Sequence, residues 1–500
     1  MPTHLVKSCL EELVPSITHI MNSSLSSGTV PELFKTSHVI PLLKKSDLNP
    51  DDFKSYRPIA NLPFLAKILE KIVASQLRVY LDKQKLFPEM QSAYRQFHST
   101  ETALIRVFND VLLAVDKGHE AVLVLLDYTA AFDSIDHTTM IDRFLRGYGI
   151  KGCALKWLDS YLDNRKQHIV VNDSISRPFP LPWGVPQGSV LGPLEFILYT
   201  GPLSAVISSH RDIHHVMYAD DTQLYVTMTS KDHVGSMHKL SECVSDVMSW
   251  SSSNKLKLNQ SKTEVLHITS QFRSSCSLPC LDAGGVEIVP SKVVRNLGVT
   301  VDNVLNMKQH IRNTCRTAAF GISRISKLRK YLDRQSTERL IHAFVTSHLD
   351  YCNGLYFGLP DSTISPLQRI QNMAARLITK TRKYEHITPI LRSLHWLPIL
   401  TRIQFKILLL VFKIKHGYAP SYLNDLLKPI VPSRSLRSTT RANFQYAPGP
   451  RTNTRYGDRT FAIAAPKLWN SLPIIIRQSP SVESFKASLK YFLFTGNSNL

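Results

Sequence analysis

Two short segments restrict the fold of this chain more than any other feature. Residues 121–126 form an apolar run that ends at the carboxylate Asp127, as a buried strand does. Residues 218–225, YADDTQLY, place the adjacent Asp220 and Asp221 between two strand-like pieces. A strand that ends in Asp beside a hairpin with Asp-Asp at its turn can bring three carboxylates to one point. The pattern therefore predicts a sheet whose strand ends carry an acidic site.

Three converging carboxylates favour a metal site. Like charges at one site are costly without a counter-charge, and carboxylate oxygens suit hard cations such as magnesium. Two such ions about 3.5–4 Å apart can clamp the attacking and leaving oxygens of a phosphoryl transfer, as in polymerases. Asp220 and Asp221 alone could be an ordinary Asp-rich turn. In this order, with GVPQGSVLGP between the segments, we interpret Asp127, Asp220 and Asp221 as metal-binding catalytic residues.

The net charge of +21 lies in one part of the chain. Residues 1–300 hold 30 Lys and Arg against 30 Asp and Glu, whereas residues 301–500 hold 30 against 9. A neutral body with a basic end favours a polyanionic partner such as nucleic acid. The alternative is a basic surface that only aids solubility.

The N-terminal sequence lacks a basic segment followed by an apolar core, so we expect no secretory signal. The longest apolar run near the end, ILLLVF, is far too short to span a bilayer. Seven scattered cysteines fit a reducing compartment. Cys276 and Cys280 lack zinc-ligand spacing, and we interpret His342, His348 and Cys352 as packed or surface residues. We expect an intracellular protein of the nucleus and cytoplasm with no membrane partner.

Hydrophobic periodicity predicts a mixture of helices and strands. We expect helices over residues 1–35, 63–82, 100–116, 138–163, 194–206, 236–253 and 306–332. We expect strands over residues 37–45, 121–126, 286–301 and from residue 168, and irregular segments over residues 49–57, 86–100 and 183–193. Ser99 is a candidate N-cap for the helix from residue 100, with Thr102 as the alternative.

The helix expected over residues 306–332 has two distinct faces. Lys308, Arg312 and Arg316 repeat every four residues on one face, and we interpret them as contacts to nucleic acid. Another face is an apolar stripe that consists of Ile311, Cys315, Ala318, Ile322 and Ile325. The alternative, a core-packed helix with a solvated basic side, is compatible with phosphate contact. Further basic amphipathic helices are expected after residue 363, with a loop over residues 432–460.

Two residues near the carboxylates are candidates for contact with a nucleotide. Phe132 lies five residues after Asp127, where a bulky ring can stack beneath an incoming sugar and clash with a 2′-hydroxyl. The alternative for Phe132 is simple core packing. Gln187 lies in WGVPQGS, where glycines allow close backbone approach to a ligand and the amide can donate and accept. We interpret Gln187 as touching the nascent base pair or the incoming sugar.

Three cations are candidates for contact with the triphosphate. Arg57 in YRPI offers a bidentate fork, and Lys44 in PLLKK offers a point charge. Lys262 in LNQSKTEVL is a candidate general acid that protonates the leaving pyrophosphate. Each of the three has an alternative interpretation as an ordinary surface cation.

Successive segments of the chain closely resemble reverse transcriptases of LINE-like non-LTR retrotransposons, above all the jockey and chicken-repeat group. The segments are FKTSHVIPLLKK, DDFKSYRPIANLPFLAKILEKIV, QSAYRQFHSTETAL, LLDYTAAFDSIDH, GVPQGSVLGPLEF, YADDTQLY, LKLNQSKTEVL and NLGVTVDNVLNMKQHI. The segments LQRIQNMAARLIT, LHWLPILTRIQFKILLLVFKIKHG and APKLWNSLP resemble the region that follows the polymerase in these elements. The resemblance covers nearly the whole chain and is far more specific than YADD alone.

The resemblance implies an α+β fold of the right-hand polymerase type, with a mainly helical, basic C-terminal region. It implies a helical extension over residues 1–35, fingers over 36–116, a palm with an antiparallel sheet and interleaved fingers segments over 117–302, a thumb over 303–362, and the basic region over 363–500. The reverse transcriptase domain would then span about residues 36–302.

The resemblance also implies an activity and its partners. Asp127, Asp220 and Asp221 would bind two Mg²⁺ ions, for which Mn²⁺ could substitute, with the backbone carbonyl of Tyr128 as a further ligand. The enzyme would add dNTPs to a primer 3′-hydroxyl on template RNA, primed by the 3′-end of nicked target DNA. The helix over residues 306–332 would be the thumb helix against the template–primer duplex.

Three features depart from the family pattern. The chain begins at the helices before the fingers, whereas family members usually carry an N-terminal endonuclease, so we expect either that the nick comes from a separate endonuclease or that the sequence is a fragment. Tyr128 stands where a smaller aliphatic residue is common, which a backbone ligand tolerates. Glu195 stands where the family usually has a leucine after GPL, and a buried unpaired carboxylate there would cost a few kcal/mol and impair folding or activity.

Other activities remain alternatives to reverse transcription. An RNA-directed RNA polymerase should hold the 2′-hydroxyl with a polar group at the position of Phe132. A catalytically impaired or domesticated nucleic-acid-binding remnant fits Glu195 and the missing nuclease. A metal nuclease without polymerase activity predicts cutting in the absence of dNTPs.

Overall fold

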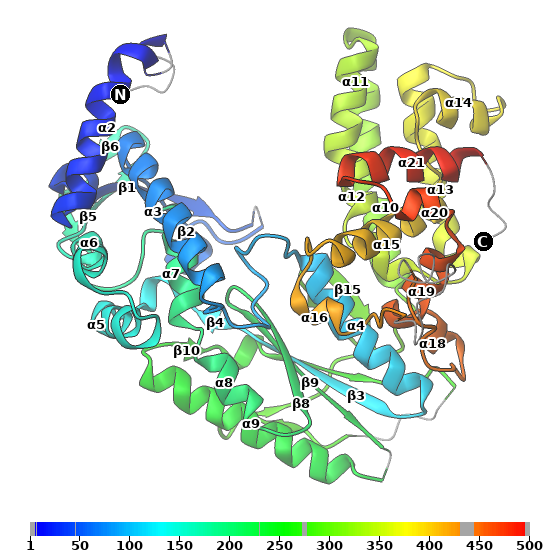
Figure 1. Ribbon diagram of the computed structural model, residues 1–500, viewed down its shortest axis with the longest axis horizontal. Helices are drawn as coiled ribbons and strands as arrows, with labels where there is room; N and C mark the ends of the chain where they lie inside the picture. The colour runs from blue at the N-terminus through cyan, green and yellow to red at the C-terminus, as the bar shows by residue number, and fades with distance from the viewer. Residues whose placement is uncertain are drawn as a thin grey trace, which may run out of the picture.

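The computed structural model describes residue 6 and residues 8–45, 47–229, 231–272, 278–430 and 445–495. Figure 1 shows the helices of the N-terminal part on one side and those of the last third on the other, with the central strands below both. None of the helices in these segments is long and apolar enough to cross a membrane.

The strands pair into several sheets, of which two matter for the site. The strands are β1 (Thr36–Leu43), β2 (Tyr56–Asn61), β3 (Glu120–Leu126), β4 (Tyr128–Thr129), β5 (Lys166–Val171), β6 (Ser174–Ile175), β7 (Phe179–Pro180), β8 (Ile213–Tyr218), β9 (Asp221–Met228), β10 (Lys257–Leu258), β11 (Glu264–Ile268), β12 (Leu281–Asp282), β13 (Glu287–Ile288), β14 (Val293–Asn296) and β15 (Val299–Asp302). The first sheet has the order β2-β1-β5-β6, and the second has the order β11-β3-β9-β8.

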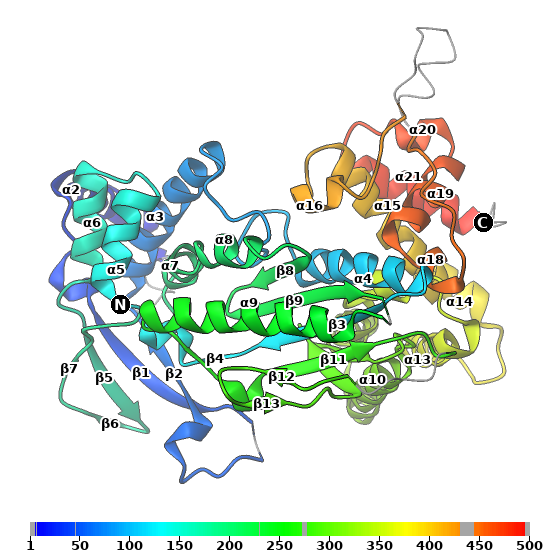
Figure 2. The ribbon, with the colours of Figure 1, turned by 90° about the horizontal axis from the view of Figure 1, so that it is seen from below.

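The helices of the first three hundred residues surround these sheets (Figures 1 and 2). They are α2 (Leu10–Ser27), α3 (Phe64–Lys83), α4 (Thr100–Asp116), α5 (His137–Asp142), α6 (Gly152–Leu162), α7 (Gly192–Tyr199), α8 (Leu203–Ser208) and α9 (His233–Ser253), with the π-helix η4 at Arg143–Gly147. The helix expected over residues 1–35 ends at Ser27, because Gly28 has a φ of 67° and closes it in a left-handed cap. The helix expected over residues 194–206 is divided between α7 and α8.

The cap of α4 follows the predicted pattern and joins both candidates. The Ser99 hydroxyl accepts from the Thr102 N–H at 3.1 Å, and the Thr102 hydroxyl accepts from the Ser99 N–H at 2.9 Å. The two residues therefore form a capping box with Ser99 as the N-cap.

The prediction of an irregular segment over residues 49–57 is wrong at its end. Tyr56 and Arg57 begin β2, which pairs antiparallel with β1 so that Arg57 lies opposite Leu42. Strand β2 lies at the edge of its sheet, where the missing N–H of Pro58 costs least. The strand expected over residues 37–45 is confirmed as β1.

The central strand β3 is buried on both faces, as its continuous apolar run predicts. Ala121 and Leu123 pack into one apolar core together with α4. Val122, Val124 and Leu126 point to the opposite core together with α7 and α9. Figure 2 shows α9 running alongside β9 and β3. The antiparallel sheet between two helical layers gives the α+β architecture expected for the palm.

After β15, the described part of the chain is mainly helical. Its helices are α10 (Lys308–Leu328), α11 (Arg334–Ile341), α12 (Ser347–Asp350), α13 (Asp361–Thr379), α14 (Ile387–Ser393), α15 (Ile399–Lys415), α16 (Ser421–Asn424), α18 (Arg455–Asp458), α19 (Phe461–Ser471), α20 (Ile474–Arg477) and α21 (Val482–Thr495), with the π-helix η7 at His342–Thr346. They share one apolar core with α4 and β3. The predicted domain boundaries stay predictions.

The expected loop over residues 432–460 and the cysteines and histidines interpreted as packed or surface residues can be compared with the structure. Part of the loop expected over residues 432–460, namely residues 432–444, lies outside the described residues, and so does Cys276. Within the remainder, α18 is helical. His342 packs its ring 5.6 Å from that of Trp396 and Cys352 is buried, as expected for packed residues.

Candidate active site

The β8–β9 hairpin and the end of β3 bring the three predicted carboxylates together. Tyr218 pairs with Asp221 across the hairpin, and Leu126 pairs with Thr222 across the neighbouring strands. Continuing that register by one residue places Asp127 opposite Asp221. The turn is tight because Ala219 adopts a left-handed φ of 57°.

Burial and the neighbouring negative charges both raise the pKa values of the carboxyls at this site. Burial raises the pKa of Asp221 to about 6, and the charges of Asp220 and Asp127 add to that rise. Burial also raises the pKa of Asp220; the charge of Asp127 adds to the rise, while Arg57 opposes it. The neighbouring cations therefore do not fully offset the burial and mutual repulsion of these carboxylates, which a bound divalent cation would relieve.

One oxygen of the site is left without a hydrogen bond. Asp127 Oδ2 is buried and accepts no hydrogen bond from any described residue, although the Lys262 ammonium lies 3.5 Å away. Within the described residues, no three Asp, Glu, His or Cys side chains are gathered closely enough to hold an ion as they stand. Three features of these residues fit a metal. Their donors are carboxylate oxygens, Asp127 Oδ2 accepts no hydrogen bond, and the carboxylates repel one another.

The Tyr128 carbonyl is directed away from its neighbouring strand. The Asn259 N–H donates to the Asp127 carbonyl at 2.8 Å, and Leu258 pairs with Tyr128 in the next position. Because hydrogen-bonded and non-hydrogen-bonded pairs alternate in an antiparallel ladder, the Tyr128 carbonyl points away from β10. The Tyr128 side chain is buried, with its hydroxyl 3.2 Å from that of Ser251. A large side chain is therefore compatible with a backbone ligand at this position.

Gln187 is held in place by a residue that the sequence patterns did not single out. Its side-chain amide donates to both carboxylate oxygens of Asp133 at 2.9 Å. Its backbone carbonyl accepts from the Ala60 N–H at 2.7 Å. Gly188, with a φ of 131°, lies so close to Ala60 that a Cβ there would meet the Ala60 carbonyl oxygen at 2.3 Å. The loop over residues 183–193 is thus wedged between β2 and the short helix η3 (Ala131–Ser134).

Phe132 has a packing partner. Its ring stacks on Phe196 of α7, with ring centroids 4.7 Å apart and planes at 23°. The side chain is nevertheless only half-buried. Both interpretations of Phe132 are therefore compatible with the structure. One face of the ring packs on the core, and part of the side chain remains accessible.

Arg57 and Lys44 lie on the β1–β2 hairpin and are exposed. Lys44 donates to the Lys54 carbonyl at 2.7 Å. Burial raises the pKa of Asp133, and its bond from Gln187 and the charge of Lys44 both oppose that rise. The charge of Arg57 thus acts on the site carboxylate Asp220, and the charge of Lys44 acts on Asp133, the partner of Gln187.

Comparison with known proteins agrees with this geometry. The family described as "Reverse transcriptase (RNA-dependent DNA polymerase)" matches residues 43–301. The chain belongs to the reverse transcriptase family. Its expected resemblance to jockey-like elements is confirmed, and the palm described above is that of a right-hand polymerase.

Two relatives of this chain come from Drosophila melanogaster. A probable RNA-directed DNA polymerase from transposon BS is 28% identical over 75% of this chain and 42% of its own length. The RNA-directed DNA polymerase from mobile element jockey is 30% identical over 62% of this chain and 33% of its own length. The chain thus matches less than half the length of either relative.

Among solved structures, apo telomerase from Candida Tropicalis aligns with a TM-score of 0.41 and 13% identity, over 79% of this chain and 67% of that chain. So distant a likeness carries no argument about function.

The three basic residues expected to bind nucleic acid lie on the exposed face of α10. Lys308, Arg312 and Arg316 are exposed on α10, and Ile311, Ala318, Ile322 and Ile325 on the same helix are buried. The two predicted faces of this helix therefore exist. Within the described residues, none of the three cations pairs with a carboxylate.

Glu195 is fully buried, as expected for a position that usually holds leucine. Neither of its carboxylate oxygens has a hydrogen-bond partner within the described residues. Burial raises the pKa of Glu195 to about 8; Glu70 adds to the rise and Arg165 opposes it. The side chain is therefore protonated at neutral pH, which limits the cost of burying it.

Proposed function

We propose that this chain is an RNA-directed DNA polymerase of a non-LTR retrotransposon. The observation that carries the proposal is the convergence of Asp127, Asp220 and Asp221 at the end of the palm sheet, beside the loop that holds Gln187. The family match and the names of its relatives support the same activity.

The carboxylates and the Tyr128 carbonyl are the groups that would hold two magnesium ions, with manganese as a substitute. The chemistry that such ions supply when bound is stabilisation of charge on the attacking and leaving oxygens of nucleotidyl transfer. Carboxylate and carbonyl oxygens form the donor set of hard divalent cations, and the orphaned Asp127 Oδ2 offers one of them.

The remaining residues act on the nucleotide. Arg57 and Lys44 bind the triphosphate from the β1–β2 hairpin, and Lys262 donates a proton to the leaving pyrophosphate. Gln187, held by Asp133, contacts the nascent base pair or the sugar. The accessible part of Phe132 excludes a 2′-hydroxyl, which selects dNTPs over ribonucleotides.

Nucleic acids are the proposed partners. Template RNA and a DNA primer, or nicked target DNA, bind along the exposed basic face of α10 at Lys308, Arg312 and Arg316. Cleavage of the target DNA by an endonuclease supplies the nick. Because chromosomal target DNA lies in the nucleus, the enzyme acts there after its synthesis in the cytoplasm.

Primer extension on a poly(A) template with oligo(dT), magnesium and dTTP tests this proposal. The wild type should extend the primer, and the Asp220→Ala/Asp221→Ala variant should not. A matched control is Glu11→Ala/Glu12→Ala, which removes two adjacent exposed carboxylates from α2 and should extend normally.

Two results would contradict the proposal. A folded wild-type protein that binds the hybrid but never extends it would favour the nucleic-acid-binding remnant, an alternative that the intact carboxylate site does not favour. Equal incorporation of ribonucleotides would favour RNA synthesis instead.

A further inference from the structure

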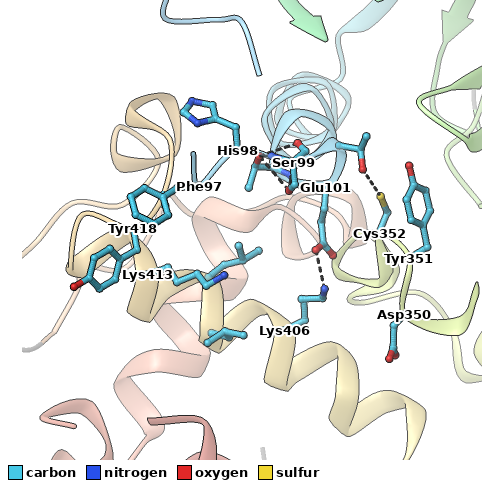
Figure 3. Close-up of a pocket in the computed structure, with 15 residues that line it drawn as sticks. Phe97, His98, Ser99, Glu101, Asp350, Tyr351, Cys352, Lys406, Lys413 and Tyr418 are labelled. Atoms are coloured by element: carbon cyan, nitrogen blue, oxygen red, sulfur yellow. Dashed lines mark hydrogen bonds and ion pairs between the residues drawn. The ribbon is translucent and has the colours of Figure 1, made fainter. Parts of the chain in front are cut away.

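A cavity of about 360 Å³ lies between the start of α4, the residues at the end of α12, and α15. Figure 3 shows the segment before α4 on one side, Tyr351 and Cys352 on another, and α15 below. The residues that matter here are Phe97, Glu101, Tyr351, Lys406, Lys413 and Tyr418. The site proposed above uses none of them.

The wall of this cavity is continuous with the catalytic hairpin. The Ser92 N–H donates to the Met217 carbonyl at 2.8 Å, and the Ala219 N–H donates to Gln91 Oε1 at 3.1 Å. Phe97 follows Gln91 by six residues, which limits the separation to about 20 Å of extended chain. The cavity therefore lies within a few nucleotides of the Asp220–Asp221 turn.

The C-terminal helices are fixed to the same segment. The Tyr422 hydroxyl lies 2.9 Å from that of Ser92 and donates to Thr102 Oγ1 at 3.1 Å, and Arg106 donates to the Tyr422 carbonyl at 3.2 Å. Tyr422 and Ser92 are both buried. Buried hydrogen bonds thus fix α16, which follows α15 in the chain, to the segment that pairs with the catalytic hairpin.

The cavity presents a cation without a direct ion-pair partner. Lys406 is paired with Glu101 at 3.0 Å, whereas Lys413, two turns further along the same face of α15, has no hydrogen-bond or ion-pair partner among the described residues. Burial lowers the pKa of Lys413; the positive charges of Lys486 and Lys406 add to that effect, and the charge of Glu101 opposes it. An anion in the cavity would relieve this repulsion.

Two aromatic side chains stand at the mouth of the cavity. Phe97 is 43% exposed and Tyr418 is 44% exposed, with ring centroids 5.4 Å apart. Phe97 adopts a left-handed φ of 65°, a conformation that costs energy for a bulky residue. Figure 3 shows both rings on the same side of Lys413. An aromatic surface beside an unpaired cation is the combination that binds single-stranded nucleic acid.

We propose that this cavity binds one nucleotide of a single-stranded segment that leaves the template–primer duplex. Its base stacks on the Phe97–Tyr418 pair, and its phosphate contacts Lys413. The inference rests on the proposed polymerase function, since it takes the strand to be part of the template–primer. A template RNA overhang and a DNA overhang offer the same chemistry, and the experiment separates them.

Fluorescence anisotropy with the full chain tests the inference on three probes. The first is a blunt RNA–DNA hybrid, the second the same hybrid with an RNA overhang, and the third the hybrid with a DNA overhang. The variants are Tyr418→Ala, which removes an exposed ring, and Lys413→Gln, which keeps most of the packed stem. Matched controls are Tyr384→Ala, at a tyrosine that is 94% exposed, and Lys151→Gln, at an exposed lysine beside α6.

The wild type should bind one overhang probe more tightly than the blunt hybrid. Tyr418→Ala and Lys413→Gln should each lose about tenfold in affinity for that probe, the effect expected for one stacked base, while the controls keep it. Equal affinity of wild type and variants for both overhang probes would overturn the inference.

The experiments distinguish a failure of the proposed polymerase function from a failure of the proposed nucleotide site in the cavity. Binding of the blunt hybrid and extension by the wild type report on the polymerase function, whereas only the overhang-dependent difference reports on the cavity. Ultraviolet cross-linking of a thiouridine in the RNA overhang to Tyr418 or Phe97 provides a second readout. Cross-links confined to other parts of the chain would contradict the inference.

Discussion

The Gln187 amide donates to both oxygens of Asp133 at 2.9 Å, across 54 positions of the sequence. This contact joins the loop over residues 183–193 to the segment that carries Phe132, so that the two proposed nucleotide contacts are positioned by one carboxylate. Asp133 is therefore a positioning residue rather than a group that touches the nucleotide.

Replacing Asp133 should weaken nucleotide binding more than chemistry. In Asp133→Asn the charge-assisted bond to Gln187 is lost, which is worth about 1.5–3 kcal/mol and corresponds to about a tenfold or larger rise in KM for dTTP. The value of kcat should change less. Steady-state extension at varied dTTP measures both.

The neighbouring variant Ser134→Ala is the control, because its hydroxyl donates only to the Ala130 carbonyl at 3.0 Å. An Asp133→Asn enzyme with an unchanged KM and a reduced kcat would show that the contact does not position Gln187 for the nucleotide.

Lys262 should act on the chemical step. Its ammonium lies 3.5 Å from Asp127 Oδ2, and its side chain is 67% exposed, so removing it should disturb the fold little. Loss of a general acid costs about 10²–10⁴-fold in rate, and we expect Lys262→Ala to reduce the single-turnover extension rate within that range.

Lys257→Ala removes an exposed lysine from the adjacent strand β10 and serves as the control. A Lys262→Ala enzyme that extends at the wild-type rate, with only the KM for dTTP raised, would make Lys262 a phosphate contact instead.

The local patterns predicted that Asp127, Asp220 and Asp221 lie near one another, and they predicted fewer of the contacts around these residues. Asp127, Asp220 and Asp221 could be found because each lies at the end of a strand whose apolar pattern is visible in the sequence. Asp133 was missed because its partner Gln187 is 54 positions away. This was so although Asp133 and Asp127 lie in the same segment, LLDYTAAFD. The bond between Tyr422 and Ser92 spans 330 positions, and no local pattern reports on it.

The prediction of an irregular segment over residues 49–57 was wrong at its end for a similar reason. The polar residues and prolines of this segment favour a loop, but pairing with the apolar strand β1 extends the backbone at Tyr56 and Arg57. Tertiary context thus overrode local propensity.

Glu195 should make the stability of the protein depend on pH. In the unfolded chain its carboxyl ionises near 4.5, whereas in the folded protein it keeps its proton until about pH 8. The free energy of unfolding should therefore fall as the pH rises between these values, and this contribution should level off above about 8. Glu70, whose pKa is raised by burial, and Arg165 are the charged groups that face it.

Glu195→Leu should remove this pH dependence and raise the melting temperature, most strongly near pH 8, by an amount that corresponds to a few kcal/mol. Thermal unfolding between about pH 5 and pH 9 measures it. Glu287→Gln, at an exposed position on β13, is the control. A melting temperature of Glu195→Leu that stays below that of the wild type at every pH would show that the carboxyl is accommodated by contacts that leucine cannot replace.

Phe132 should determine sugar selection. Phe132→Val removes most of the ring, so the space for a 2′-hydroxyl opens while dNTP binding remains. Differences of this size in a pocket are worth about 10–200-fold, and we expect the ratio of ribonucleotide to deoxynucleotide incorporation to rise within that range. Competitive single-nucleotide extension with UTP and dTTP measures this ratio.

The same substitution removes the stack on Phe196 at 4.7 Å, which is worth about 0.5–1.5 kcal/mol beyond buried area. A lower melting temperature is therefore expected with the altered selectivity, and Phe196→Leu separates the two effects because it removes the stack but keeps the Phe132 ring. If Phe132→Val lowers stability and leaves selectivity unchanged, Phe132 is a packing residue and the gate lies elsewhere.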